Sequence, residues 1–115
     1  MNDVEEKLVS ELKLSPQQAK VFVFIVKNGK KSAKDIAQSL GMSDSEAFEV
    51  AKSLVDFGGF IDITKTEFES THPRFAVVNM YRRMCMRENI PFKKNLLVDN
   101  ISIVLENPYD DARTK

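Results

Sequence analysis

The sequence predicts a mainly α-helical fold with a small β-hairpin, and three observations lead to this prediction. Two segments, 32–40 and 43–57, each begin with a serine three residues before a carboxylate, and a glycine follows each of them. The corner between them is short enough to make a helix-turn-helix. The segment 60–64 then alternates apolar and polar residues, as a half-buried strand does. The predicted architecture is therefore a winged helix-turn-helix, with the hairpin as the wing, followed by a C-terminal helix.

Two helices are predicted before the corner. Apolar residues at helical spacing predict a short amphipathic helix over residues 3–13. Ser15 as the cap and Pro16 at the first helical position predict the start of a second helix, which ends at Gly29. Its centre, residues 21–26, is apolar on all sides. That pattern predicts the central buried helix of the domain.

The second helix of the corner has the more complete start signal. Ser43 and Glu46 have the spacing of a full capping box, in which the serine oxygen accepts from an amide of the first turn and the glutamate accepts from the serine amide. Gly41 stands where a left-handed residue ends the preceding helix. These signals predict both sides of the turn.

The returning strand of the hairpin falls within residues 68–78. Pro73 limits backbone pairing, so we predict the strand at Arg74–Val78, with the tip of the hairpin at 65–67. Asn79 is then predicted to cap a helix through Glu88, and Pro91 to restart a helix to about residue 106. The predicted divisions are a winged helix-turn-helix domain (1–78), C-terminal helices (79–106) and a flexible tail (107–115).

The helix predicted after Pro91 carries an apolar seam. So much apolar surface after a small domain has to be buried, and we expect it to pack against a partner chain in a homodimer rather than fold back. Residues 101–105 alternate well enough to form a strand, so that alternative stays open. The predicted dimer interface consists of Ile90, Leu97, Ile101 and Val104.

Composition narrows the function classes. The 115 residues carry 17 basic and 17 acidic side chains, so no net charge draws the chain to nucleic acid or to a membrane. One cysteine and one histidine provide neither a disulfide nor a zinc cluster, and no apolar run is long enough for a membrane span. We expect a cytoplasmic protein with no catalytic residues, no metal and no cofactor.

Several short segments together resemble a known family. They are Leu14-Ser15 ahead of 19–22, then 33–37, then 48–54, and finally 73–77. From Leu12 to about Val78 the sequence resembles the N-terminal winged helix of TrmB-like archaeal transcription regulators, which are relatives of MarR-type repressors. The resemblance implies a dimer that binds operator DNA. Such regulators often carry a sugar-binding C-terminal domain, for which this chain is too short.

The resemblance also suggests which residues meet DNA. Basic residues at the start of the first corner helix would hold the phosphate backbone, and the exposed face of the second would approach the major groove. Basic residues beside the wing would complete the contact. The candidate DNA-binding residues are Lys30, Lys31, Lys34, Ser43, Ser45, Phe48, Lys52, Lys65 and Arg74.

The second corner helix is acidic where family members are commonly basic or neutral. Asp44 and Glu46 can start the helix by offsetting the positive end of its dipole, or accept a hydrogen bond from a base. Together with Glu49 they can instead form a face for a basic protein. Double-stranded DNA is therefore the first predicted partner, and the alternative is a winged-helix interaction module that does not bind DNA.

Overall fold

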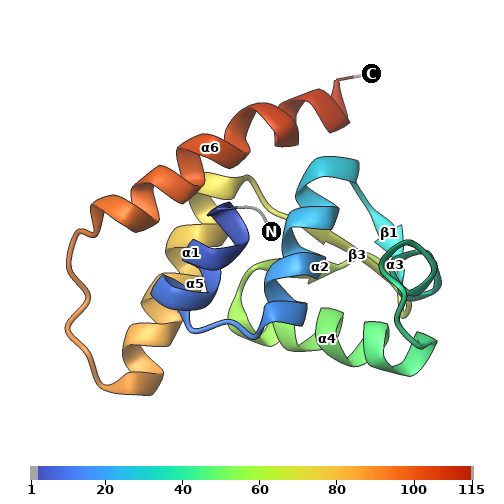
Figure 1. The fold of residues 1–115 in the computed structure, drawn as a ribbon, viewed down its shortest axis with the longest axis horizontal. Helices are drawn as coiled ribbons and strands as arrows, with labels where there is room; N and C mark the ends of the chain where they lie inside the picture. The colour runs from blue at the N-terminus through green and yellow to red at the C-terminus, as the bar shows by residue number, and fades with distance from the viewer. Residues whose placement is uncertain (1–2, 115) are drawn as a thin grey trace.

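The computed structural model describes residues 3–114, which form six helices and three short strands (Figure 1). None of these helices is both long and apolar enough to cross a membrane. The helices are α1 (Asp3–Leu12), α2 (Pro16–Asn28), α3 (Ala33–Leu40), α4 (Asp44–Phe57), α5 (Pro73–Glu88) and α6 (Leu96–Arg113). The strands are β1 (Lys31–Ser32), β2 (Phe60–Asp62) and β3 (Glu67–Ser70). The predicted fold class is confirmed: α3 and α4 form the corner, and β2 and β3 form the wing.

Helix α2 is the centre of the core, as predicted. It contacts α1, α4, α6 and strand β3. Val21, Phe22, Ile25 and Val26 are fully buried. Burying each such side chain contributes roughly 1.5–3 kcal/mol, so α2 holds together elements from both ends of the chain.

Serine hydroxyls cap three of the helices. Ser32 and Ser43 accept from the amides of Asp35 and Glu46, each at 3.1 Å. The full capping box predicted at Ser43 is found instead at Ser15, whose amide donates to Gln18 Oε1 at 2.8 Å. The Gln18 side chain also donates to Ser53 on α4 at 2.9 Å, which holds it over the helix start. The Glu46 side chain is exposed.

The sheet has the order β1-β3-β2, with both pairs antiparallel. The returning strand predicted at Arg74–Val78 is wrong, because β3 occupies 67–70 and Pro73 begins α5. Proline lacks the amide that a strand needs but suits the first turn of a helix. Strand β1, which the sequence analysis did not predict, pairs Lys31 with Phe68.

Helix α5 caps the C-terminus of α4. Asn79, predicted as an N-cap, lies within α5 and donates from Nδ2 to the Gly58 carbonyl at 3.0 Å. Arg83 donates to the Asp56 carbonyl at 2.7 Å. Gly58 has φ +92°, and a Cβ there would lie 2.5 Å from Asn79 Nδ2, so only glycine fits. These bonds satisfy carbonyls that a helix end leaves unpaired.

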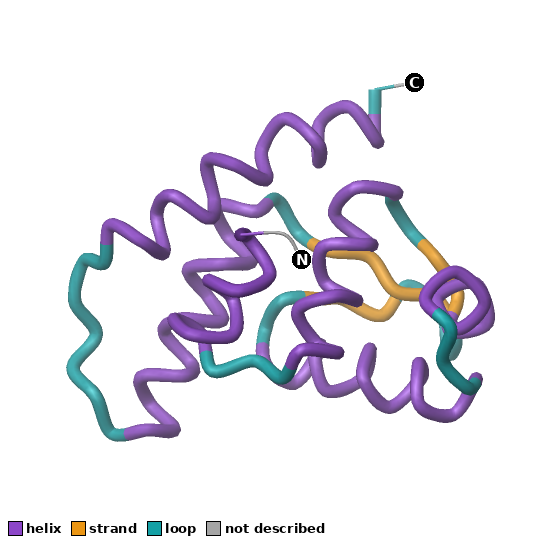
Figure 2. Tube along the Cα trace, in the orientation of Figure 1, coloured by secondary structure: helices purple, strands orange, loops and turns teal. Residues whose placement is uncertain are grey.

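Helix α6 folds back over the domain, contrary to the prediction (Figure 1). A long loop follows α5, and α6 begins at Leu96, capped by Asn95 rather than restarted by Pro91 (Figure 2). Ile101 and Leu105 are buried against α1, α2 and α5, and residues 101–105 are helical rather than a strand. Residue 78, the predicted domain end, lies within α5.

The predicted flexible tail is helical as far as Arg113, with Pro108 inside the helix; Lys115 lies outside the described residues. The Arg113 guanidinium donates to the carbonyls of Ile25 and Val26 at 3.2 and 2.9 Å, and pairs with Glu69 on β3. It also lies 3.7 Å from the centroid of the Tyr109 ring. Arg113 therefore caps α2 and joins α6 to the wing.

We predict that Arg113→Met lowers the free energy of unfolding by about 3 kcal/mol, because it leaves Glu69 as a largely buried charge without its partner. Arg74→Met is the matched control. It breaks the ion pair between Arg74 and Glu106 on α6, but Arg74 is mostly exposed and the loss should be much smaller. Chemical denaturation measures both. Equal losses would contradict the capping role of Arg113.

Candidate nucleic-acid interface

The corner leaves the N-terminal half of α4 open to solvent. Gly41 ends α3 at φ +70° and donates its amide to the Ala37 carbonyl, and Ser43 then caps α4. Ala47, Ala51 and Leu54 face the core. The opposite side of the helix is exposed and includes Ser43, Asp44, Ser45, Phe48, Glu49 and Lys52.

Two of these exposed side chains also hold the wing. The ring of Phe48 packs edge-on against buried Phe68 of β3, with centroids 6.1 Å apart, and 37% of the residue stays exposed. Lys52 Nζ lies 3.8 Å from Asp62 Oδ2 on β2. Phe48 is therefore anchored at one edge and open at the other, and the Lys52 charge is partly offset.

The wing tip is attached to the start of α3. The Ala33 amide donates to the Thr66 carbonyl at 2.8 Å, next to the pairing of Ser32 with Glu67. Because Lys34 follows Ala33 and Lys65 precedes Thr66, the backbones of two lysines from distant parts of the sequence lie close together at this edge. Lys30 and Lys34 are exposed, Lys65 is exposed at the tip, and Lys31 is half-buried in β1.

Lys20 and Gln17 also belong to this surface, although the sequence analysis did not select them. They line a depression of about 210 Å³ together with Met42 and Glu46 at the N-terminus of α4. Lys20 lies on the exposed side of an otherwise buried helix. A single lysine in an apolar run was the only signal available for it.

Arg74 was predicted to lie beside the wing, but it lies in the first turn of α5. It donates from Nε to Glu106 Oε2 on α6 at 2.8 Å, and His72 Nε2 lies 3.6 Å from the same oxygen. The hydrogen bond from Arg74 lowers the pKa of the Glu106 carboxyl and raises the pKa of Arg74. Arg74 therefore braces α5 against α6.

The surface is mixed in charge. Asp44 and Glu46 lie at the positive end of the α4 dipole, while lysines stand on α2, α3 and the wing around them. Among the described residues, no group of His, Cys, Asp and Glu side chains is placed to hold a metal ion. The arrangement suits hydrogen bonding and ion pairing with a polar partner.

The predicted dimer residues are divided by the folding back of α6. Ile101 is fully buried in the core of its own chain, so it is not part of an exposed seam. Ile90, Leu97 and Val104 each remain close to half exposed.

The chain was compared with protein families, curated proteins and solved structures. The family model described as "Sugar-specific transcriptional regulator TrmB" matches residues 8–83. This range extends from α1 through the corner and the wing into α5. No curated protein and no solved structure matches the chain.

Because of the Glu106 carboxylate, the thermal stability of the chain should fall at low pH. A carboxyl whose pKa is lowered by folding contributes stability that is present above its ordinary pKa of about 4.3 and is lost as pH falls through the lowered value. We predict that Glu106→Gln loses less thermal stability than the parent between pH 7 and pH 3. Thermal melts at both pH values test this, with Glu88→Gln at an exposed position as the control. Equal acid losses in the parent and Glu106→Gln would refute it.

Proposed function

The chain belongs to the TrmB family of transcriptional regulators, and from that premise we propose that it acts in the cytoplasm as a homodimer that binds double-stranded DNA. Its affinity comes mainly from phosphate contacts. Lys30, Lys31, Lys34 and Lys65 hold the backbone, and Ser43, Ser45 and Lys52 approach the major groove with the open edge of Phe48.

The observation that carries this proposal is the contact between the wing tip and α3. The bond from the Ala33 amide to the Thr66 carbonyl brings the backbone at Lys34 and at Lys65 close together, at the start of the corner that leads into α4. A helix flanked by basic side chains is the arrangement that fits a major groove bordered by two phosphate strands. Arg74, bound to Glu106, is not part of this surface.

We predict that the parent chain binds a random duplex at about 50 mM salt and loses several decades of affinity by about 200 mM, as six or more phosphate contacts require. Lys31→Glu with Lys34→Glu should abolish binding at moderate salt. Fluorescence anisotropy measures both. The matched control is Lys13→Glu with Lys93→Glu, which makes the same charge change at two exposed loop positions away from α3 and the wing. Unchanged affinity in the Lys31/Lys34 variant would rule out this docking mode.

A second candidate function rests on the acidic face of α4. Asp44, Glu46 and Glu49 are exposed, and none of them has an ion-pair partner within residues 3–114. Such a face suits a basic protein. Asp44→Arg with Glu46→Lys separates the two functions: it tightens DNA binding in the first case and weakens a protein complex in the second. Both residues lie in the first turn, so a melt must accompany the assay.

The proposed dimer uses apolar surface on α5, α6 and the loop between them. Four exposed large hydrophobic residues make up this surface: Phe75, Val78, Phe92 and Ile103. Val78 lines two adjoining hollows of about 570 and 300 Å³, with Phe75 and Phe92 in one and Ile103 in the other. Arg74, Arg82, Lys94 and Asp99 line the same hollows, so this is an apolar patch rimmed by charged residues, which a second copy would cover.

We predict that Phe75→Lys with Ile103→Lys converts the dimer into a monomer, because each places a charge in the apolar contact. Sedimentation equilibrium measures the mass. Leu97→Lys with Val104→Lys makes the same change elsewhere on α6 and should leave the dimer intact. If only Leu97→Lys with Val104→Lys dissociated the dimer, the interface would lie at the seam predicted from the sequence. A monomeric parent chain would refute the dimer.

A further inference from the structure

The exposed side of α5 near its C-terminus carries three arginines without carboxylate partners in the described part of the chain. Arg82 donates to Asn79 Oδ1 at 2.8 Å, and Arg83 to the Asp56 carbonyl at 2.7 Å. The Arg87 guanidinium lies 4.1 Å from the centroid of the Phe57 ring. Each guanidinium has five N–H donors, so most of their donors remain available to a ligand.

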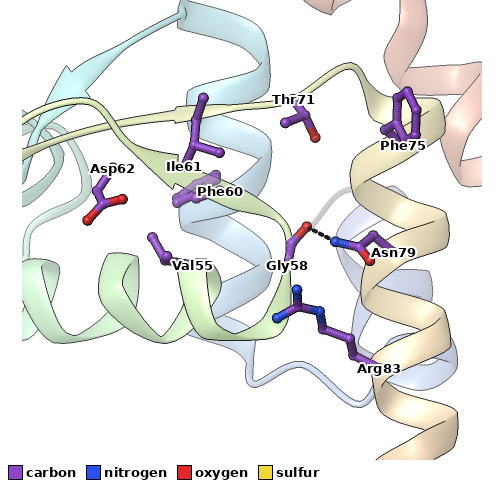
Figure 3. Close-up of a pocket in the computed structure, with 9 residues that line it drawn as sticks. All are labelled: Val55, Gly58, Phe60, Ile61, Asp62, Thr71, Phe75, Asn79 and Arg83. Carbon is purple, nitrogen blue, oxygen red and sulfur yellow. Dashed lines mark hydrogen bonds between the residues drawn. The ribbon is translucent and has the colours of Figure 1, made fainter.

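Two hollows meet at Arg83, and together they form what we call the Arg83 groove. The first, of about 490 Å³, lies between α4, β2 and α5, with Val55 and Ile61 among its lining residues (Figure 3). The second, of about 330 Å³, is lined by Asp56, Phe57, Arg83, Met86 and Arg87. The groove thus has apolar side chains on both sides of a basic centre.

The strand beside the groove is an edge strand. In the order β1-β3-β2, β2 pairs with β3 on one side only. An edge strand next to a groove can pair with the backbone of an extended peptide, while the groove takes alternate side chains. Ile61 of β2 is about half exposed and lines the groove.

We infer that the Arg83 groove binds an extended acidic peptide segment of another protein, in which apolar side chains stand on both sides of the carboxylates. Arg83 and Arg87 pair with the carboxylates, which suit the forked geometry of guanidinium. Val55 and Ile61 contact one apolar side chain, and Phe57 and Met86 contact the other. Two carboxylates line the groove, Asp62 in the first hollow and Asp56 in the second. Lys52 lies 3.8 Å from Asp62, so the positive charges at the groove outnumber the negative ones.

Charge and apolar lining together favour a peptide over nucleic acid. A duplex needs a broad basic track for its phosphates, whereas Met86 is 76% exposed between the arginines. The groove also lies at the C-terminal end of α4, a helix of 14 residues. At 1.5 Å per residue this end is about 20 Å from the N-terminal end that carries the proposed DNA surface. The DNA surface nevertheless extends to Lys52, which lies beside Asp62 of the first hollow, so the two sites adjoin there.

The test selects peptides from a random dodecapeptide library displayed on phage, using the full chain as bait. The expected consensus has Asp or Glu flanked by apolar residues. A fluorescein-labelled peptide of that consensus should bind the parent and lose at least tenfold in affinity to Arg83→Glu with Arg87→Glu. Because Arg83 caps α4, Met86→Glu with Arg87→Glu provides a second variant that leaves the cap in place, with the same expected loss. Lys13→Glu with Lys93→Glu should bind the peptide like the parent.

Three results of the peptide and DNA assays would overturn the inference. They are a consensus without acidic residues, peptide affinity that survives both groove variants, and a groove variant that loses DNA affinity as fully as Lys31→Glu with Lys34→Glu. The last would make the groove part of the DNA footprint. Binding of the chain to phosphatidylglycerol vesicles that the groove variants abolish, without any acidic consensus, would assign the groove to a membrane instead. Peptide binding without DNA binding would leave the inference standing and refute the proposed function.

Discussion

The structure depends on one constraint: a helix whose centre is apolar all round must be covered on every side there. Helix α2 is that helix, and α1, α4, α6 and β3 contact it. The backbone carbonyls at the C-terminal end of α2 need hydrogen-bond donors as well, and Arg113 provides them from the last turn of α6. This requirement explains why α6 folds back over its own domain, since the α2 carbonyls and the buried face of α6 satisfy each other within one chain.

Much of the fold follows from local sequence signals. The serine caps at Ser15, Ser32 and Ser43 and the glycine ends at Gly41 and Gly58 place five helix starts or stops correctly, because each acts through bonds within a few residues. The errors lie where distant contacts decide. The short polar strand at 67–70 forms because Phe68 enters the core, and α6 continues through Pro108 because Tyr109 and Arg113 bind elsewhere in the chain.

The candidate DNA surface was predictable only in part, for the same reason. The exposed face of α4 follows from helical periodicity, since Ala47, Ala51 and Leu54 mark the buried side. The meeting of Lys34 and Lys65 does not, because it depends on the pairing of β1 and β3. Arg74 was misplaced through the same error about the returning strand. Ile101 was assigned to an exposed seam because the sequence alone does not tell which apolar residues of α6 the domain itself covers.

The attachment of the wing has a consequence for how a bound duplex would behave. Three contacts hold the wing: the hydrogen bond from the Ala33 amide of α3 to the Thr66 carbonyl, the packing of Phe48 against Phe68, and the ion pair of Lys52 with Asp62. A wing held at three points is already ordered before DNA binds, so it loses little conformational entropy on docking. It also cannot bend to follow the groove. The double helix has to supply the adjustment, and sequence preference would then come partly from how easily each base step deforms.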